Sequence, residues 1–400
     1  MPKPDFTKYP EWKSAAYIKH CLLQEYLPSW AYKVGHAWDS LVYVDGFAGP
    51  WETNDPGYAD TSFAVAIDSL QESKVGLSNR GRNLIVSAIL VERDPNAFSK
   101  LEAYANQRSS DTFQVHALPG KFVDNIASIE QIVRREAPRP FKFVLLDPKG
   151  WADIPIAQLK HFLHSRSSEV LVNLMTKHII RFLQAQDRES SYLNLFGRDG
   201  VLDTLKRAKS GEKMDAAVKE YCRSLKLLCG FKYVSSAIVL EPDRKAIRYF
   251  LVYATNAPDG IEVFKAAEIK AARIQEAVRD EHRVRKSGQP DLVGFCDELP
   301  FSSFTESLRR RYTELARAKV IRLIQRGWPK GVLYRDVYCE AMSFPLVTPQ
   351  DLAEWVEELG PFISVNLVCP DGKKRRKPSL YAEDYLTVTD NAGLAQKAEE

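Results

Sequence analysis

The order of apolar and polar residues predicts a helix first and then a series of buried strands. In residues 11–32, apolar side chains from Trp12 to Tyr26 recur at steps of three and four positions. This spacing places them on one face of a helix. Short, nearly continuous apolar runs follow, which are typical of strands covered on both faces. These runs lie at 41–45, 84–92, 112–117, 141–147 and 169–174.

Helical stretches separate the runs, and this alternation predicts parallel strands joined by crossover helices. The helices are expected at 61–72, 95–107, 121–136, 155–165 and about 201–228. Two further apolar runs, 231–241 and 246–255, are separated only by PDRK. Because a link this short cannot make a crossover, the two runs should form an antiparallel hairpin. The expected fold class is α/β, with the Rossmann-like sheet of S-adenosylmethionine (SAM) methyltransferases: five parallel strands plus an antiparallel hairpin.

The chain is expected to divide into two domains. Residues 1–286 would form the methyltransferase-type domain, in which a Gly-, Asn-, Asp- and Ser-rich insert at 51–83 separates the first two strands by more than a single helix. A change of composition at 287–303 indicates a linker. Three helices and a strand pair then predict a C-terminal winged helix-turn-helix domain at 304–386, with a polar tail at 387–400.

Composition supports a globular chain without a membrane span. The 400 residues are 45% hydrophobic and 27% charged, and no apolar run reaches the roughly 18 residues of a spanning helix. The N-terminus is polar and has no signal-peptide pattern, so we expect a cytoplasmic location. The six cysteines are scattered without a C-x-x-C pair, which predicts reduced, structural thiols and no metal site.

The loop after the first strand is the first candidate site. Small residues let backbone N–H groups approach an anionic or carboxylate-bearing ligand, and nucleotides bind at this loop in α/β sheets. We therefore expect a nucleotide-like cofactor here, SAM first; a purely structural turn is the alternative. The predicted cofactor-binding residues are Asp45, Gly46, Phe47, Ala48 and Gly49, together with Glu92 at the end of the second strand.

Two other strand ends carry polar residues. Glu92 occupies a position that commonly accepts hydrogen bonds from ribose hydroxyls, the alternative being an exposed loop acid. The segment VLVNLMTKHIIRF brings Asn173, Lys177 and His178 to the end of the fifth strand. His178 is a candidate base, although a lone histidine is more often structural.

The fourth strand ends in FVLLDPKGW, residues 143–151. Amino-methyltransferases carry a D-P-P-aromatic loop at this point, in which the acid or the proline carbonyl accepts from the target amine and the aromatic ring stacks on the base. Here a lysine replaces the second proline and Gly150 is inserted before the tryptophan. Helix capping is the alternative role for the acid. The predicted catalytic residues are Asp147, Pro148, Lys149 and Trp151.

The expected wing of the C-terminal domain carries a basic run. Residues 363–384 are predicted to form two strands around a turn at Asp371-Gly372. Cations at the tip of a wing would contact phosphates and release counterions. We therefore expect nucleic-acid binding there, the alternative being a solvated charge run. The run consists of Lys373, Lys374, Arg375, Arg376 and Lys377.

Taken in order, these pieces resemble the three-Cys-motif partner proteins (TcmP). The resemblance rests on YIKH…YLPSW, LVYVDGFAGP, LLDPKGW, VLVNLM and YFLVYATN, covers roughly residues 8–290 and continues into the C-terminal domain. The D-G-F-A-G-P motif is its specific part. It implies a methyltransferase-like core, signature positions at 45–50 and at 147, 148, 150 and 151, and a partner protein bearing three cysteines. This chain departs from the family pattern at Trp51, where glycine is frequent, and at Lys149, where an aromatic is usual.

Two functional hypotheses follow from the sequence. The first is a SAM-dependent methyltransferase that acts on nucleic acid or on a substrate delivered by a partner. The second is a non-catalytic nucleotide-binding or DNA-reading accessory protein that works with a three-cysteine-motif partner. The acids at 45, 92 and 147 favour the enzyme, whereas Lys149 in the expected catalytic loop favours the accessory protein.

Overall fold

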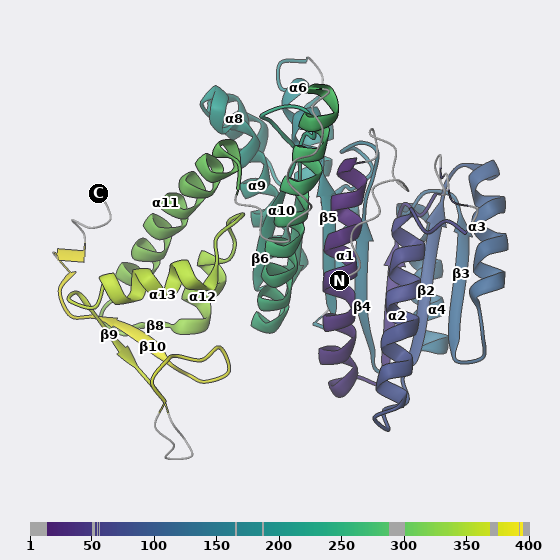
Figure 1. Cartoon of the computed structure of the whole chain (residues 1–400), viewed down its shortest axis with the longest axis horizontal. Helices are drawn as coiled ribbons and strands as arrows, with labels where there is room; N and C mark the ends of the chain where they lie inside the picture. Colours follow the sequence, from purple (N-terminus) through teal and green to yellow (C-terminus); the bar gives the residue numbers. More distant parts are fainter. Residues whose placement is uncertain are drawn as a thin grey trace.

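The sheet at the centre of the protein has seven strands, of which six run in the same direction (Figure 1). The computed structural model describes residues 14–49, 53, 55, 57–164, 166–185, 188–287, 301–368, 375–391 and 393–394. The strand order is β3-β2-β1-β4-β5-β7-β6, and β7 is antiparallel to both neighbours. The strands are β1 (Ser40–Asp45), β2 (Ile85–Glu92), β3 (Phe113–Pro119), β4 (Pro140–Leu146), β5 (Ser168–Leu174), β6 (Tyr233–Leu240) and β7 (Ile247–Thr255).

This order confirms the predicted α/β class and is consistent with a Rossmann-like methyltransferase fold. Each of the seven predicted runs forms a strand within two residues of the expected bounds. Strands β1 and β5 are buried at every position, because the layer is covered on both faces. Strand β1 lies between β2 and β4 with Asp45 level with Leu90 and Leu145, so its carboxyl end meets theirs at one edge.

Three long helices lie side by side over one face of the sheet: α1 (Ser14–Ala37), α2 (Ser62–Ser78) and α10 (Pro258–Ser287) (Figure 1). Among the described residues between β1 and β2, α2 is the single helix, so the expectation that 51–83 separates these strands by more than one helix is wrong there. None of the described helices combines the length and apolar character needed to cross a membrane. The remaining helices of this part are α3 (Pro95–Arg108), η3 (Val123–Asn125), α4 (Ile126–Glu136), α5 (Ile156–Leu163), α6 (Thr176–Arg181), α7 (Glu189–Phe196), α8 (Val201–Arg207), η4 (Ser210–Glu212) and α9 (Lys213–Cys229).

Helix α1 packs on the sheet through the predicted apolar face, on which Ile18, Leu22 and Tyr26 are buried. The Tyr26 hydroxyl donates to the buried carboxyl of Glu169 at the start of β5. Burial raises the pKa of Glu169, while the hydrogen bond from Tyr26 lowers it. The Tyr26 ring also lies 5.3 Å from the ring of Phe143 in β4, measured between centroids. These contacts fix the helix against the centre of the sheet.

The C-terminal part packs against the edge strand β6. It contains α11 (Ser303–Arg326), β8 (Val332–Leu333), α12 (Tyr334–Ala341), α13 (Pro349–Glu358), β9 (Ile363–Asn366) and β10 (Tyr385–Val388), and its strands form a small antiparallel sheet in the order β8-β10-β9. The Ser235 hydroxyl donates to the carbonyl of Met342 at 2.6 Å, and Ser236 donates to Ser343 at 3.0 Å. The two parts are therefore joined directly as well as through the chain.

The last strand lies later in the sequence than predicted. Among the described residues of 363–384, β9 is the one strand, and its partner β10 begins at Tyr385 and extends into the segment expected to be a polar tail. The buried carboxylate of Asp384 accepts from the Val368 and Ser379 N–H groups, so it holds the described residues just before β10 away from a strand pairing. The expected turn at 371–372 lies outside the described residues.

A buried ion pair also joins the two parts. Lys265 and Glu268, one turn apart on α10, are paired and almost fully buried. Lys265 Nζ donates to the carbonyl of Phe344 at 2.9 Å, and the Leu346 N–H donates to Glu268 Oε1 at 2.8 Å. Each charge of the pair thus also holds one backbone group of the segment between α12 and α13.

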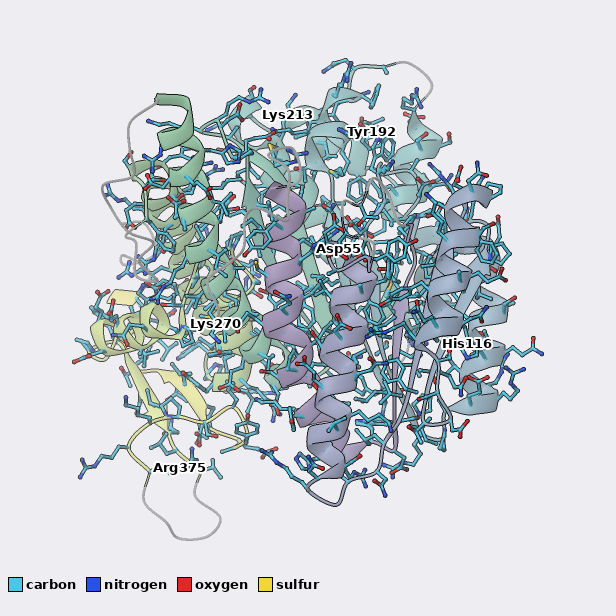
Figure 2. All side chains as sticks on the ribbon, turned by 45° about the vertical axis from the view of Figure 1, so that its right-hand side comes forward. Asp55, His116, Tyr192, Lys213, Lys270 and Arg375 are labelled. Atoms are coloured by element: carbon cyan, nitrogen blue, oxygen red, sulfur yellow. The ribbon has the colours of Figure 1, made fainter. Side chains whose placement is uncertain are left out.

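Replacement of Lys265 by methionine should destabilise the protein by about 3–5 kcal/mol, because Glu268 would be left buried without its cation. Urea unfolding at pH 7 measures the change. Lys270→Met on the same helix is the matched control, since Lys270 is exposed, pairs with Glu25 at 2.6 Å (Figure 2 labels Lys270) and should cost about 1 kcal/mol or less. Equal effects of the two substitutions would contradict the role assigned to the buried pair.

Candidate functional site

The loops after β1, β2, β3 and β4 surround one cavity of about 350 Å³. Its lining includes Gly46 and Phe47 after β1, Glu92 at the end of β2, the 120–124 loop after β3 and Asp147 after β4. They meet because the carboxyl ends of parallel strands share one edge of a sheet. The structure therefore brings residues predicted to bind a cofactor and the predicted catalytic acid to the same hollow.

Asp45 is fully buried and organises the first loop. Its Oδ1 accepts from the Phe47 N–H at 3.0 Å, and its Oδ2 accepts from the hydroxyls of Ser62 at 3.1 Å and Tyr43 at 3.3 Å. Burial raises the pKa of Asp45 to about 6, the hydrogen bond from the Phe47 N–H opposes this change, and the negative charge of Asp147 adds to it. The carboxyl group thus tethers β1 to its loop and to the start of α2.

The backbone N–H groups of this loop are used within the protein. Gly46 donates to the carbonyl of Leu145 at 3.0 Å and Ala48 to the carbonyl of Val91 at 2.9 Å. A side chain at position 46 would place its Cβ 3.0 Å from the ring of Phe122, so the glycine lets the loop after β3 pack directly on the loop after β1. A ligand in the cavity would meet side chains and carbonyl oxygens of this loop more readily than N–H groups.

Glu92 lies at the cavity with its side chain largely buried. Its Oε1 accepts from the Asp94 N–H at 2.6 Å, and its backbone carbonyl accepts from the Gly120 N–H at 2.9 Å. Burial raises the pKa of Glu92, and hydrogen bonds from the Asp94 and Arg93 N–H groups oppose the change. The carboxyl is therefore fixed in place at the wall where it was predicted to meet a ribose.

Asp147 makes the contact that the sequence did not indicate. It is ion-paired with Lys19, which is buried on α1. Its other oxygen accepts from Asn173 Nδ2 at 2.6 Å. Asn173 is buried at the end of β5, and its Oδ1 accepts no hydrogen bond from the part of the chain that the structure describes. Acid, cation and amide thus form a polar cluster with one unused acceptor.

The rest of the predicted catalytic loop divides between the cavity and the core. Lys149 is exposed and lines the cavity. Pro148 is buried, and Trp151 is buried with its ring 5.3 Å from that of Tyr192 on α7. In this conformation Trp151 packs inside the protein and does not present a flat surface to an acceptor.

Two parts of the candidate site were not predicted from the sequence: Lys19 and the loop after β3. Lys19 carried a signal, because it is a charge that falls beside the apolar face of α1 and only three residues before Leu22. Nothing in its spacing indicated the partner, which lies 128 residues away. The sequence signal for the loop after β3 was Gly120. This glycine directly follows β3 and has a φ of +105°, a conformation that favours glycine.

The predicted basic run lies elsewhere. Figure 2 shows Arg375 near the bottom of the view, well away from Asp55 near its middle, which belongs to the segment between β1 and α2. The guanidinium of Arg375 is held by the buried carboxylate of Asp384 at 2.7 and 2.8 Å, so this residue supports the loop. Arg376 and Lys377 are exposed, whereas Lys373 and Lys374 lie outside the described residues.

The described cysteines are free and none belongs to a metal site. Burial raises the pKa of each of three thiols, those of Cys21, Cys222 and Cys229, to about 12, so they are protonated near neutral pH. Within the described residues, no group of three His, Cys, Asp or Glu side chains is placed to hold a metal ion.

Comparison with solved structures finds several similar chains. No protein-family profile matches the sequence, and no curated protein matches it. The structure is similar to the crystal structure of a DUF574 family protein from Streptomyces avermitilis, with 11% sequence identity and a TM-score of 0.34. The similarity covers 62% of this chain and 87% of the other.

Asp45 should make the stability of the protein fall with rising pH. Its pKa of about 6 in the folded protein lies above its ordinary value of 3.8, so the folded state holds the proton more tightly. The stabilisation is present below about pH 4 and is lost as the pH rises through 6. At about 1.4 kcal/mol for each pH unit, the loss amounts to about 3 kcal/mol.

The Asp45→Asn variant lacks this loss, because an amide does not ionise. Relative to wild type, its free energy of unfolding should therefore improve by about 3 kcal/mol between pH 4 and pH 7, measured by urea unfolding at both values. Asp111→Asn, at an exposed turn, controls for the removal of a surface charge. A pH-independent difference between Asp45→Asn and wild type would show that the carboxyl is not perturbed.

Proposed function

We propose that this chain is a SAM-binding, methyltransferase-like protein. The observation that carries the proposal is the cavity where four consecutive strand ends of a 3-2-1-4-5-7-6 sheet meet, with Glu92 on one wall and Asp147 on another. Ligands of open α/β sheets bind at this edge. The cavity volume of about 350 Å³ lies in the range of small-molecule sites.

The chemistry of the lining suits this cofactor. SAM carries a sulfonium and an ammonium group, both positive, and buried carboxylates nearby stabilise positive charge. Glu92 would accept from the ribose hydroxyls, and Asp147 lies after β4, on the other side of β1, where an acceptor would be oriented. Bound SAM supplies an electrophilic methyl group, and the contribution of the chain would be to position the acceptor. The unused Asn173 Oδ1 beside Asp147 offers a place for an acceptor N–H or O–H.

A second candidate function is an accessory role without transfer. It is favoured by the contact of Lys19 with Asp147, because an amine of the protein itself already occupies the acid that would hold an acceptor. The buried position of Trp151 points the same way. In this case the fold would bind a nucleotide-like ligand and recruit others.

The resemblance to TcmP proteins supports a partner bearing three cysteines under either function. We also propose that α11, β8, α12, α13, β9 and β10 form the expected winged helix-turn-helix domain, which their order along the chain supports. Arg376 and Lys377 would then contact nucleic acid, with Lys373 and Lys374 beside them in sequence and Arg375 supporting the loop.

Calorimetric titration with SAM tests cofactor binding. Wild type should bind in the micromolar range, and Glu92→Gln should weaken binding about tenfold, because an amide accepts poorly from two hydroxyls and loses a charge-assisted hydrogen bond of about 1.5 kcal/mol. Glu102→Gln, an exposed acid on α3, should leave the affinity unchanged. The absence of heat and of a thermal shift with millimolar SAM would remove the cofactor assignment.

Transfer is tested with isotope-labelled SAM and mixed-sequence DNA and RNA oligonucleotides. Asp147→Asn and Lys149→Ala should abolish incorporation while SAM affinity stays within about threefold, or under 1 kcal/mol. Lys19→Met separates the two functions. If wild type transfers nothing and Lys19→Met does, the lysine blocks the acceptor position. If neither protein transfers while SAM binds, the accessory role is the correct one.

A further inference from the structure

A larger hollow of about 1130 Å³ lies between α9 and α11, apart from the candidate site. One wall is a face of α9, and the other is a face of α11. Parts of β6, β7 and the 343–345 segment form its floor. At one end, Asp215 at the start of α9 accepts from Arg311 and from the Tyr312 hydroxyl on α11. The walls of this groove are therefore tied together at that end.

Both walls of the groove carry rows of cations. Positions 219, 223 and 226 on α9, and 319, 322 and 326 on α11, recur at three- and four-residue steps, so each row follows one face of its helix. At 1.5 Å per residue, neighbouring charges in a row are about 4.5–6 Å apart along the axis. A smaller hollow of about 190 Å³ is lined by the α11 row and Glu340. The residues are Lys219, Arg223, Lys226, Lys319, Arg322 and Arg326.

Most of the positive charge on the groove walls is not neutralised by ion pairs with described residues. Four of the six cations, Lys219, Arg223, Arg322 and Arg326, are exposed and make no ion pair with a described residue. The other two share one acid: the carboxylate oxygens of Glu340 lie 3.9 Å from Lys226 Nζ and 3.7 Å from Lys319 Nζ. A carboxylate of the chain thus marks a position where an anion fits between the two walls.

We infer that this groove binds the sugar-phosphate backbone of a single nucleic-acid strand. Regularly spaced cations on two facing walls match a polymer with one negative charge on each unit, and arginine binds phosphate in a bidentate manner. Of the lining aromatics, Phe250 and Tyr312 are buried and Phe344 is half-buried, so the groove lacks a row of exposed rings for base stacking and should bind with little sequence preference. The walls are bridged by Asp215 and Glu340, which favours one strand over a duplex.

The position of the groove adds to this inference. Figure 2 shows Lys213, at the start of α9, near the top of the view and Arg375 near the bottom, with Asp55 between them. A strand in the groove would run from Asp215 at the start of α9 toward Glu340 of α12 in the C-terminal part. The inference extends the proposed function by naming a substrate-binding surface, but binding of a strand does not require SAM.

Fluorescence anisotropy with a labelled, mixed-sequence 20-nucleotide DNA strand and its RNA counterpart, without SAM, tests the inference. The Lys219→Gln, Arg223→Gln, Arg322→Gln, Arg326→Gln variant should bind at least tenfold more weakly at 50 mM salt than wild type. The slope of log affinity against log salt should become shallower by about 0.7 for each phosphate that the variant no longer neutralises.

The matched control removes four cations from α2, α3 and α4 at the far end of the sheet: Lys74, Lys100, Arg134 and Arg135, each changed to glutamine. It should keep wild-type affinity and slope. An equal loss in both variants would show that only net charge matters and would overturn the inference, as would an unchanged affinity in the groove variant.

Glu340→Gln provides a test in the opposite direction. Its side chain competes for Lys226 and Lys319, so the variant should bind the strand several-fold more tightly than wild type, an effect that misfolding cannot produce. Polyglutamate serves as competitor. If it displaces the strand as effectively per charge as unlabelled DNA, the groove is a site for acidic polypeptide and the inference fails. Because SAM is absent throughout, this result is independent of the test of the cofactor.

Discussion

The placement of α1 against the sheet controls the chemistry of the candidate site. Lys19 and Tyr26 are seven residues apart, two turns of helix, and therefore project from the same face about 10 Å apart along the axis. Lys19 reaches the acid at the end of β4, and Tyr26 reaches the acid at the start of β5. One helix that precedes the sheet in sequence thus supplies the partners of the half-buried Asp147 and the buried Glu169. Without Lys19 of this helix, no cation would offset the repulsion between the carboxyl groups of Asp45 and Asp147.

The same arrangement explains which features of the structure could be predicted from the sequence and which could not. The strands were predictable because each is an apolar run bounded by polar residues, and β1 and β5 are buried throughout. Glu92 and Asp147 were predictable as site residues because strand ends of a parallel sheet converge. The contact of Lys19 with Asp147 was not, because it depends on the tertiary position of α1 and joins residues 128 positions apart.

Local sequence patterns were a poor guide at positions where a tertiary contact determines the structure. The glycine at 46 was predicted to let a ligand approach; it lines the cavity, and the ring of Phe122 is a second reason why a side chain does not fit there. The segment before β10 reads as a strand, but Asp384 captures Arg375 and two N–H groups and makes a loop of it. Helix α10 was missed although it spans 30 residues, because its buried face includes Lys265, Glu268, Gln275 and Glu276 and so lacks a clean apolar stripe.

The packing of the C-terminal part against β6 has a consequence for truncated forms of the chain. Edge strands expose unpaired backbone groups and invite association with other chains. Strand β6 ends the sheet, yet all but its first residue are buried, and two of its serines bond to the segment after α12. A fragment that stops before α11 would uncover an apolar edge of eight residues and should self-associate. Truncation between the two parts is therefore expected to yield aggregates. The C-terminal part would thus protect the edge of the sheet from association with other chains.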